Sequence, residues 1–554
     1  MSRQDSHSFT QLAAYKLLTE HAESCKQLHM RRLFSIDSQR HRKMSLKFDW
    51  LLLDYSKNCI TDKTLALLFQ LAREANLGHA INSMFQQAGL SQINKRPALH
   101  TALRNPGSES ALVDGHDVMP EVSELLSKMQ QLTERLHRRE YTGFSGQPIT
   151  NIVNISIGGS GMGPECICKA LTPYHQIPTL SLHFVSNIDG AQIQETLNKL
   201  NPATTVFIIS SKSFTTPETI ANAKVAKQWL LEAASGQNTA QHFIAVTSNH
   251  HAATLFGIHD DNIFRLWDWL DYRYASWSAV GLPIVLSIGT RHFMDFLQGA
   301  HEMDQHFYQA DFEENMPVIL ALIGIWYNNF LGAETQAILP YDHNLADLPR
   351  HIEQLDMQTC GRSVDNFGRT IEYATGPIIW GGNALDNQHA FYQLLHRGNK
   401  IIPADFIVSM RTHSIHQEQH DRLFANAVAQ TEALMRGRTL NETLSVVDQE
   451  SYQQHDAENT IPHRVFDGNN PSNMLLLERV SPKSLGILLA LYEHKTFTQS
   501  ILWNINPFDQ WGVKLSDSLS HRILQELHIP SCTTQHDAST NTLIRHYREK
   551  VYPA

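Results

Sequence analysis

The chain has 554 residues, and its 45 Lys and Arg against 55 Asp and Glu give a net charge of −10 with neutral histidines. That balance argues against a nucleic-acid or anionic-membrane binder, which needs a basic face. It is compatible with a local basic pocket for a small anion. Glycine (28) and proline (21) are too few for a collagen-like or low-complexity chain. At about 150 residues per domain, this length favours two large domains or three to four smaller ones.

Compartment and metal content are also indicated by composition. The six cysteines are too few and too scattered for a disulfide framework, which favours a reducing compartment. No apolar signal segment opens the chain, and the longest apolar run, 316–327, is shorter than the ~18 residues of a membrane span. The histidines of HEMDQH at 301–306 are five apart, which does not suit a zinc helix. We expect a cytoplasmic protein without membrane or metal binding.

The first 120 residues are predicted to be mainly helical. Segments 10–28 and 62–87 carry apolar residues at helical spacing, and 121–139 repeats this pattern. Between the first two, residues 46–57 alternate loosely and are interpreted as a short strand or hairpin.

Short apolar strands then alternate with helices in two successive series. A parallel sheet covered on both faces explains this pattern. The first series has predicted strands at 151–157, 181–187, 204–211 and 242–249. After a helical stretch at 290–330, the second series has predicted strands at 334–342, 376–382, 401–409 and 473–481.

The predicted fold class is α/β. No literal repeat is evident, but the two series suggest two similar, doubly wound parallel-sheet subdomains. The expected divisions are an N-terminal helical region at 1–120, α/β subdomains at 121–290 and 291–505, and a C-terminal helical tail at 506–554.

Two strand-to-helix loops are suited to an anion. In SIGGSGMGP (156–164), glycines let backbone N–H groups approach a ligand, Ser160 adds a hydroxyl, and Pro164 suits the first turn of the next helix. This loop is neither GxGxxG nor a Walker A motif, so dinucleotide and nucleoside triphosphate binding are disfavoured. Ordinary helix capping is the alternative interpretation.

The second loop, SSKSFTTPET (210–219), is richer in donors. It gathers one cation, Lys212, with hydroxyls at the carboxyl end of a predicted strand, where α/β proteins bind ligands. Thr216 is a natural N-cap before Pro217, and a helix start favours phosphate. Capping alone is again the alternative.

Several long motifs together resemble the glucose-6-phosphate isomerase family, in order and at matching spacing. They are SIGGSGMGP, SKSFTTPETIANA, FRLWDW, RYASWSAVGLPI, GPIIWG, NQHAFYQLLHRG, IPADFI and NPFDQWGV, and LKFDWLLLDYSKN and LHTALRN extend the resemblance over nearly the whole chain. It implies a homodimer of sugar-isomerase-type (SIS) subdomains with a site shared between subunits. The implied activity is reversible isomerisation of glucose 6-phosphate and fructose 6-phosphate, in glycolysis and gluconeogenesis, with a phosphorylated hexose as ligand and no cofactor.

The resemblance also implies roles for individual residues. The matching arginine, Arg273, would stabilise the enediolate intermediate. His389, from the partner subunit, would open the sugar ring with support from Glu218. The positions matching substrate-binding residues are Gly159, Ser160, Ser211, Lys212, Ser213, Thr216, Gln354 and Gln510. A structural ion pair for Arg273 and a core position for His389 are the alternatives.

The chain departs from the family at catalytic positions. Gln358 stands where the family has the glutamate that moves the proton between C1 and C2, and a neutral amide accepts no proton near pH 7. Asp517 replaces the family's ring-opening lysine, and Lys514 the glutamate three residues before it. Asp271 and Tyr272 replace two glycines before Arg273 and are expected to crowd its loop. The segment GGNALDNQHA differs as well.

Four functions are therefore compatible with the sequence. The first is a glucose-6-phosphate isomerase with reduced turnover. The second is a catalytically impaired sugar-phosphate-binding or regulatory paralogue. The third is ring opening or anomer exchange by His389 and Glu218 without isomerisation, and the fourth is an interaction protein that binds no sugar. Glu353 and Asp356 lie near Gln358, but on a helix neither would share its direction.

Overall fold

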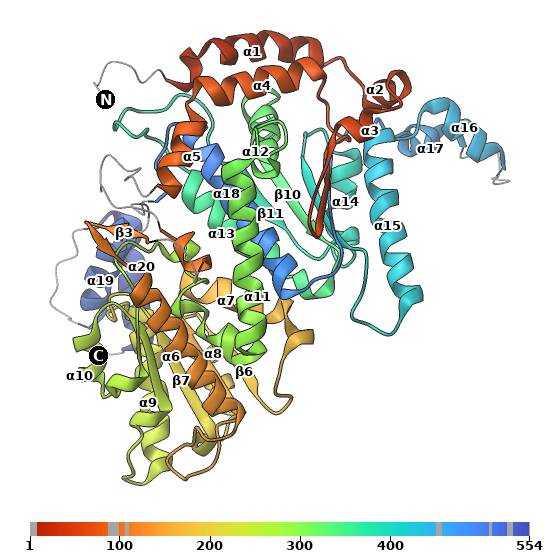
Figure 1. Ribbon diagram of the computed structural model, residues 1–554. Coiled ribbons are helices and arrows are strands. Elements are labelled where there is room, and N and C mark those ends of the chain that lie inside the picture. The colour runs from red at the N-terminus through yellow and green to blue at the C-terminus, as the bar shows by residue number, and fades with distance from the viewer. Residues whose placement is uncertain are drawn as a thin grey trace. The chain divides into compact units, whose positions relative to one another are not determined.

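Figure 1 shows the computed structural model, which describes residues 8–86, 99–105, 110–449, 457–508, 512, 514–528 and 536–552. Internal contacts divide the chain into two compact units, Met1–Pro507 and Phe508–Ala554. No helix in the described part is long and apolar enough to cross a membrane.

The first sheet is entirely parallel, as predicted, with five strands in the order β6-β5-β7-β8-β9. These are β5 (Asn151–Ser156), β6 (Ser181–Val185), β7 (Thr205–Ser210), β8 (Phe243–Thr247) and β9 (Ile263–Arg265). Both β7 and β8 are buried along their whole length, which their continuous apolar sequences require. Only the three-residue β9 was not predicted.

The second sheet joins the N-terminal region to the second series, in the order β1-β2-β13-β12-β10-β11. Its parallel strands are β10 (Thr335–Pro340), β11 (Ile378–Gly381), β12 (Ala404–Ser409) and β13 (Ser472–Leu477). The hairpin of β1 (Ser45–Phe48) and β2 (Leu51–Asp54) is antiparallel, and β2 pairs with β13. The N-terminal region is therefore not only helical. Its hairpin belongs to this sheet, where Leu51 and Leu53 of β2 are buried.

Six α-helices lie in the described part of the first 140 residues. They are α1 (Ala13–Cys25), α2 (Met30–Ile36), α3 (Arg40–Lys43), α4 (Asp62–Glu74), α5 (Leu77–Phe85) and α6 (Met119–His137). The single helix expected at 62–87 is two helices, since the chain turns at Asn76, whose φ is 55°.

Two long helices pack along each other: α11 (Leu282–Gln309) and α18 (Pro482–Leu502). Glycine allows the approach, since a Cβ on Gly299 would lie 2.0 Å from the carbonyl oxygen of Lys483. The adjoining α12 (Met316–Ile325) continues into a π-helical turn, Trp326–Phe330. Gly289, with φ at 78°, interrupts α11 next to the expected boundary at residue 290.

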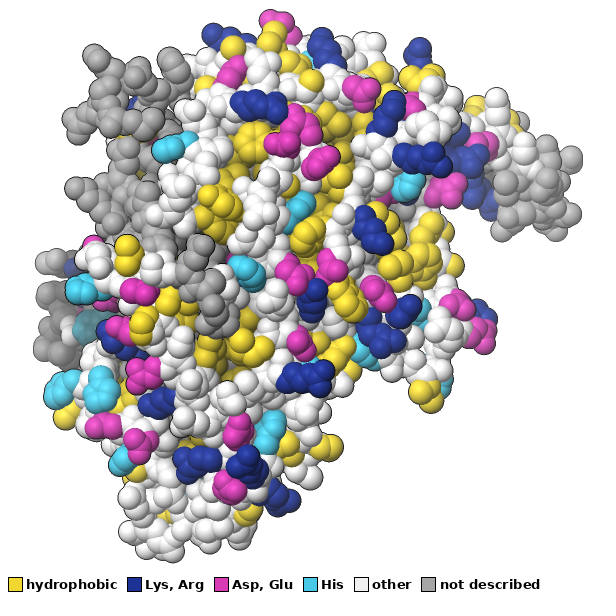
Figure 2. Space-filling model, in the orientation of Figure 1, with side chains coloured by type: hydrophobic (Ala, Val, Ile, Leu, Met, Phe, Trp, Pro, Cys, Tyr) yellow, Lys and Arg dark blue, Asp and Glu magenta, His cyan; other side chains and the backbone are white. Residues whose placement is uncertain are grey.

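The remaining helices mostly follow strands, as βα units require. They are α7 (Gly159–Ala170), α8 (Gly190–Leu197), α9 (Pro217–Ala234), α10 (His250–Phe256), α13 (Leu348–Cys360), α14 (Gln388–Arg397), α15 (Gln417–Arg436), α16 (Leu440–Gln449) and α17 (Ala457–Arg464). The second unit contains α19 (Lys514–His528) and α20 (Ala538–Val551). On the face drawn in Figure 2, basic and acidic side chains are interspersed.

Candidate functional site

The loop after β7 gathers its hydroxyls as predicted. Ser211 Oγ and Thr216 Oγ1 lie 2.9 Å apart, and Thr215 Oγ1 donates to Ser213 Oγ at 2.7 Å. The Ser211 N–H donates to the carbonyl of Val246 at 3.0 Å, which fixes the loop to the end of β8. Thr216 occupies the N-cap position of α9, but its hydroxyl does not cap the helix. That hydroxyl faces Ser211 instead, so capping alone does not account for the loop.

Lys212 connects this loop to the segment that precedes Arg273. Its Nζ donates to the carbonyl oxygens of Asp268 and Leu270 at 3.1 and 3.2 Å. In the other direction, the Lys212 carbonyl accepts from the N–H of Ser248 at 3.0 Å. The ammonium is only partly buried, so it holds two loops together while remaining near solvent.

The glycine loop lies between this segment and α13. Gly158 has φ at 62° and turns the chain directly into α7, which begins at Gly159. The prediction that the helix begins at Pro164 is wrong, since Pro164 lies inside α7, where it removes one helix hydrogen bond. A Cβ on Gly159 would lie 2.9 Å from the Tyr272 carbonyl oxygen, and the buried Ser160 donates its hydroxyl to the Ile157 carbonyl at 2.9 Å.

Arg273 is held by a carboxylate from its own loop. It lies in the short turn η7 (Tyr272–Tyr274), and its side chain is 1% exposed. Nε and Nη2 donate to the two carboxylate oxygens of Asp271 at 3.0 and 2.8 Å, and Nη1 donates to Thr359 Oγ1 at 2.7 Å. Such a two-point pair balances the guanidinium charge locally. Asp271 thus binds Arg273 rather than crowding it, and the ion-pair alternative describes Arg273 in this structure.

Two predicted residues, Gln354 and Gln358, lie one turn apart on α13. A Cβ on Gly158 would meet Gln354 Nε2 at 3.4 Å, so Gln354 borders the glycine loop. Gln358 precedes Thr359, the partner of Arg273. Its Oε1 is shielded from solvent and has no hydrogen-bond partner among the described residues. The amide therefore has an unused acceptor one residue before the Thr359 that contacts Arg273.

The acidic neighbours of Gln358 are directed elsewhere. Because 348–360 is a helix, neither Glu353 nor Asp356 shares the direction of Gln358. Asp356 is fully buried and paired with Lys495 Nζ at 3.2 Å. Burial raises the pKa of Glu353, which is only partly exposed. Neither carboxylate takes the place of the family's glutamate.

The other predicted residues are dispersed or undescribed. His389 is exposed at the second position of α14, so the core-histidine alternative is wrong. Glu218 lies in the first turn of α9, and within the described ranges no hydrogen bond or ion pair joins it to His389. Asp517 is in the first turn of α19, within the second unit, and Gln510 lies outside the described residues.

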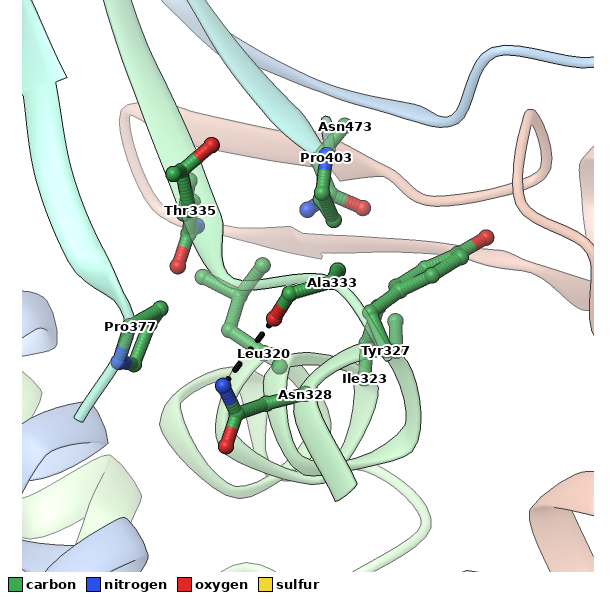
Figure 3. Close-up of a pocket in the computed structure, with 11 residues that line it drawn as sticks. Leu320, Ile323, Tyr327, Asn328, Ala333, Thr335, Pro377, Pro403 and Asn473 are labelled. Atoms are coloured by element: carbon green, nitrogen blue, oxygen red, sulfur yellow. Dashed lines mark hydrogen bonds between the residues drawn. The ribbon is translucent and has the colours of Figure 1, made fainter. Parts of the chain in front are cut away.

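A small cavity lies at the amino ends of the second sheet's strands (Figure 3), opposite the edge where α/β proteins bind ligands. Thr335, Pro377, Pro403 and the π-helical residue Asn328 line it, and Asn328 Nδ2 donates to the Ala333 carbonyl at 3.0 Å. Its volume of about 10 Å³ has room for roughly one water molecule. It is too small for a sugar.

Four segments thus converge at the carboxyl ends of the first sheet: the Ser/Lys/Thr loop, the glycine loop, the Arg273 turn and α13. Hydroxyls, backbone N–H groups and cations gather at this edge, which is where α/β proteins commonly bind small ligands. The model of the phosphoglucose isomerase family matches residues 54–544, and the chain belongs to this family.

Curated relatives match over nearly their full length. The chain is 48% identical to glucose-6-phosphate isomerase 2 of Chromobacterium violaceum, covering 96% of both chains. It is 46% identical to glucose-6-phosphate isomerase of Methylococcus capsulatus, covering 97% of this chain and 99% of the relative. A crystal structure of a glucose-6-phosphate isomerase from Chlamydia trachomatis superposes with a TM-score of 0.83 at 29% identity, covering 98% and 99% of the two chains.

Two residues that hold Arg273 were missed from the sequence. Asp271 was noted only as a bulky replacement, although an acid two residues before an arginine is a signal for a local pair. Thr359 gave no separate signal, because its contact with Arg273 joins segments 86 positions apart.

Proposed function

We propose that this protein interconverts glucose 6-phosphate and fructose 6-phosphate by ring opening and enediol proton transfer. The main structural observation behind this proposal is that the Ser/Lys/Thr loop and the Arg273 turn converge at the carboxyl edge of the first sheet. The names of the 46–48% identical relatives support this activity. The alternative is a paralogue that binds the sugar phosphate but is catalytically impaired. An assay would support it by showing binding without turnover.

The proposal assigns roles to both retained loops. Phosphate would accept hydrogen bonds from the hydroxyls of Ser211, Ser213 and Thr216, with Lys212 supplying charge and Gly159 and Ser160 beside it. Arg273 would stabilise negative charge on the enediolate, and Gln354 and Gln510 would contact the sugar.

Ring opening is assigned to an imidazole from a second copy of the chain. In this proposal the protein is a cytoplasmic homodimer acting in glycolysis and gluconeogenesis, and His389 of the partner subunit acts with Glu218. The exposure of His389 and its lack of a described partner support a role across a subunit interface. A nearby carboxylate orients an imidazole and stabilises its protonated form, so that the imidazole can transfer a proton during opening of the sugar ring.

Fructose 6-phosphate formation by the full-length protein tests the activity directly. We expect turnover in the wild type and an approximately tenfold higher KM in Thr216→Val, because a hydrogen bond to a charged group contributes about 1.5–3 kcal/mol. Thr254→Val, an exposed hydroxyl on α10, is the matched control and should leave KM unchanged. Binding of 6-phosphogluconate without any product would instead establish the paralogue.

Asp271→Asn tests whether the local carboxylate weakens Arg273 toward an anionic ligand. Opposite charges about 4 Å apart interact by up to ~4 kcal/mol at a partly buried site, so removing the carboxylate should strengthen 6-phosphogluconate binding by about tenfold. Titration calorimetry measures the change. Thr359→Val removes the neutral partner of Arg273 and should not strengthen binding. Unchanged or weaker binding in a folded Asp271→Asn protein contradicts this role.

A further inference from the structure

The loop after β12 repeats the loop after β7 position by position. Aligned on the two buried strands, TVFIISSKSFT (205–215) corresponds to ADFIVSMRTHS (404–414). Each strand ends in serine. Two positions later comes a basic residue, which is followed by a hydroxyl residue, a variable residue and a second hydroxyl residue. The matched pairs are Ser210 with Ser409, Lys212 with Arg411, Ser213 with Thr412 and Thr215 with Ser414.

The backbone of the two loops is anchored in the same way. The first residue after each strand donates its N–H to the neighbouring strand: Ser211 to Val246 at 3.0 Å and Met410 to Leu477 at 2.8 Å. The strand neighbours are equivalent, since β7 pairs with β8 and β12 with β13, both parallel. The second sheet therefore presents a hydroxyl loop at its own carboxyl edge.

The same local turn follows in both loops. Thr215 N–H donates to Ser213 Oγ at 3.3 Å, and Ser414 N–H donates to Thr412 Oγ1 at 3.0 Å. The cations differ in their contacts, since Lys212 donates to the carbonyl oxygens of Asp268 and Leu270 whereas Arg411 pairs with Glu478 at 3.2 Å. Both loops thus share sequence pattern and backbone geometry.

A cavity of about 330 Å³ opens beside the second loop. It is bordered by the ends of β10 and β12 and the first turns of α15, and its size suits a small ligand. Ser409, Thr412 and Ser414 line it together with the imidazoles of His343, His413, His416 and His420. This cavity is lined by hydroxyl and imidazole donors, and it lies at the edge where parallel sheets bind ligands.

The chemistry of this lining favours an anion over a cation. Among the residues described, no three His, Cys, Asp or Glu side chains are arranged to hold a metal ion. The one carboxylate of the lining, Asp342, already accepts from Ser409 Oγ at 3.1 Å and from the Asn344 N–H at 3.0 Å. His413 Nε2 lies 2.6 Å from the Val480 carbonyl oxygen, so that imidazole is also engaged. The hydroxyls of Thr412 and Ser414 and the imidazoles of His343, His416 and His420 remain as donors, and phosphate oxygens accept from both kinds of group.

We propose that this cavity is a second phosphate-binding site, on the second sheet, for inorganic phosphate or the phosphate group of a small ester. It differs from the first loop where Met410 and Ile415 replace Ser211 and Thr216. Imidazoles supply donors there in place of the two missing hydroxyls. The proposal does not depend on isomerase activity.

Chemical modification of the histidines locates the ligand. Trypsin releases residues 412–422, which contain His413, His416 and His420, as one peptide. Full-length protein is treated with diethyl pyrocarbonate with and without inorganic phosphate, and the modified peptide is quantified by mass spectrometry. Phosphate and glucose 6-phosphate are both expected to slow modification of this peptide several-fold, whereas glucose is not. No protection by phosphate, or equal protection by glucose, overturns the proposal.

Two matched double variants assign the protection to one loop. Thr412→Val with Ser414→Ala should abolish protection of the peptide and leave the rate of fructose 6-phosphate formation unchanged. Ser213→Ala with Thr215→Val, at the corresponding positions of the first loop, should leave protection intact. Loss of protection in the first-loop variant alone overturns the proposal. The wild-type result stands independently if a variant fails to fold, and loss of isomerase activity by itself bears only on the proposed function.

Discussion

Replacing Gln358 with glutamate is expected to raise the turnover number for fructose 6-phosphate formation by about 10²–10⁴-fold, the usual contribution of a general base. The wild-type amide accepts no proton near neutral pH. Neither Glu353 nor Asp356 points as Gln358 does, and Asp356 is bound to Lys495. The chain therefore provides no carboxylate on α13 to move the proton between C1 and C2.

The surroundings of Gln358 suit a carboxylate. Its Oε1 is shielded from solvent without a described partner, and burial raises a carboxyl pKa toward the range where it exchanges protons near neutrality. The next residue, Thr359, accepts a hydrogen bond from Arg273. A glutamate at position 358 would therefore be a carboxyl group with a raised pKa, one residue from this contact.

Initial rates of product formation measure this effect. Gln358→Met, which has similar length and no basic atom, is the matched control and should not exceed the wild type. Equal turnover in wild type and Gln358→Glu, with similar KM, would show that proton transfer does not depend on this position.

Arg104→Met is expected to lower the free energy of unfolding by about 3–5 kcal/mol, the typical cost of leaving a buried charge without its partner. Arg104 lies in the short turn η2 (Ala102–Arg104) and its side chain is completely buried. Nη1 pairs with Asp304 of α11 at 2.6 Å, and Nη2 pairs with Glu493 of α18. Methionine would remove the only cation of these two contacts while filling similar space.

The surrounding groups explain why this loss is large. His494 Nε2 lies 2.7 Å from Asp304 Oδ1, and burial lowers the pKa of this imidazole. Trp277 Nε1 donates to Glu493 at 3.0 Å, and its ring lies 4.3 Å from the guanidinium carbon. Asp304 and Glu493 would therefore be left buried together without the guanidinium that pairs with both.

Urea unfolding followed by circular dichroism measures the difference. Arg73→Met is the matched control, because the Arg73–Glu313 pair is about half exposed on both sides and such pairs contribute at most about 1 kcal/mol. If both variants lose a similar free energy of unfolding, burial does not strengthen the ion pairs of Arg104.

Much of the fold could be predicted from sequence, because buried parallel strands are continuous apolar runs and their helices are amphipathic. Four of the five strands in the first sheet, and every parallel strand of the second, were found in this way. Element ends were less accurate. The start of α7 and the break between α4 and α5 were missed, since the positive φ angles of Gly158 and Asn76 decide where these helices begin and end.

The sequence by itself determined the Ser/Lys/Thr loop, the glycine turn and the alternation of strands and helices, because each depends on residues a few positions apart. Only the tertiary structure decided the pairing of β2 with β13, the contact between Arg273 and Thr359, and the buried Arg104 pairs. These contacts join residues tens to hundreds of positions apart. Their energy depends on burial and distance in space, and neither quantity is encoded by spacing along the chain.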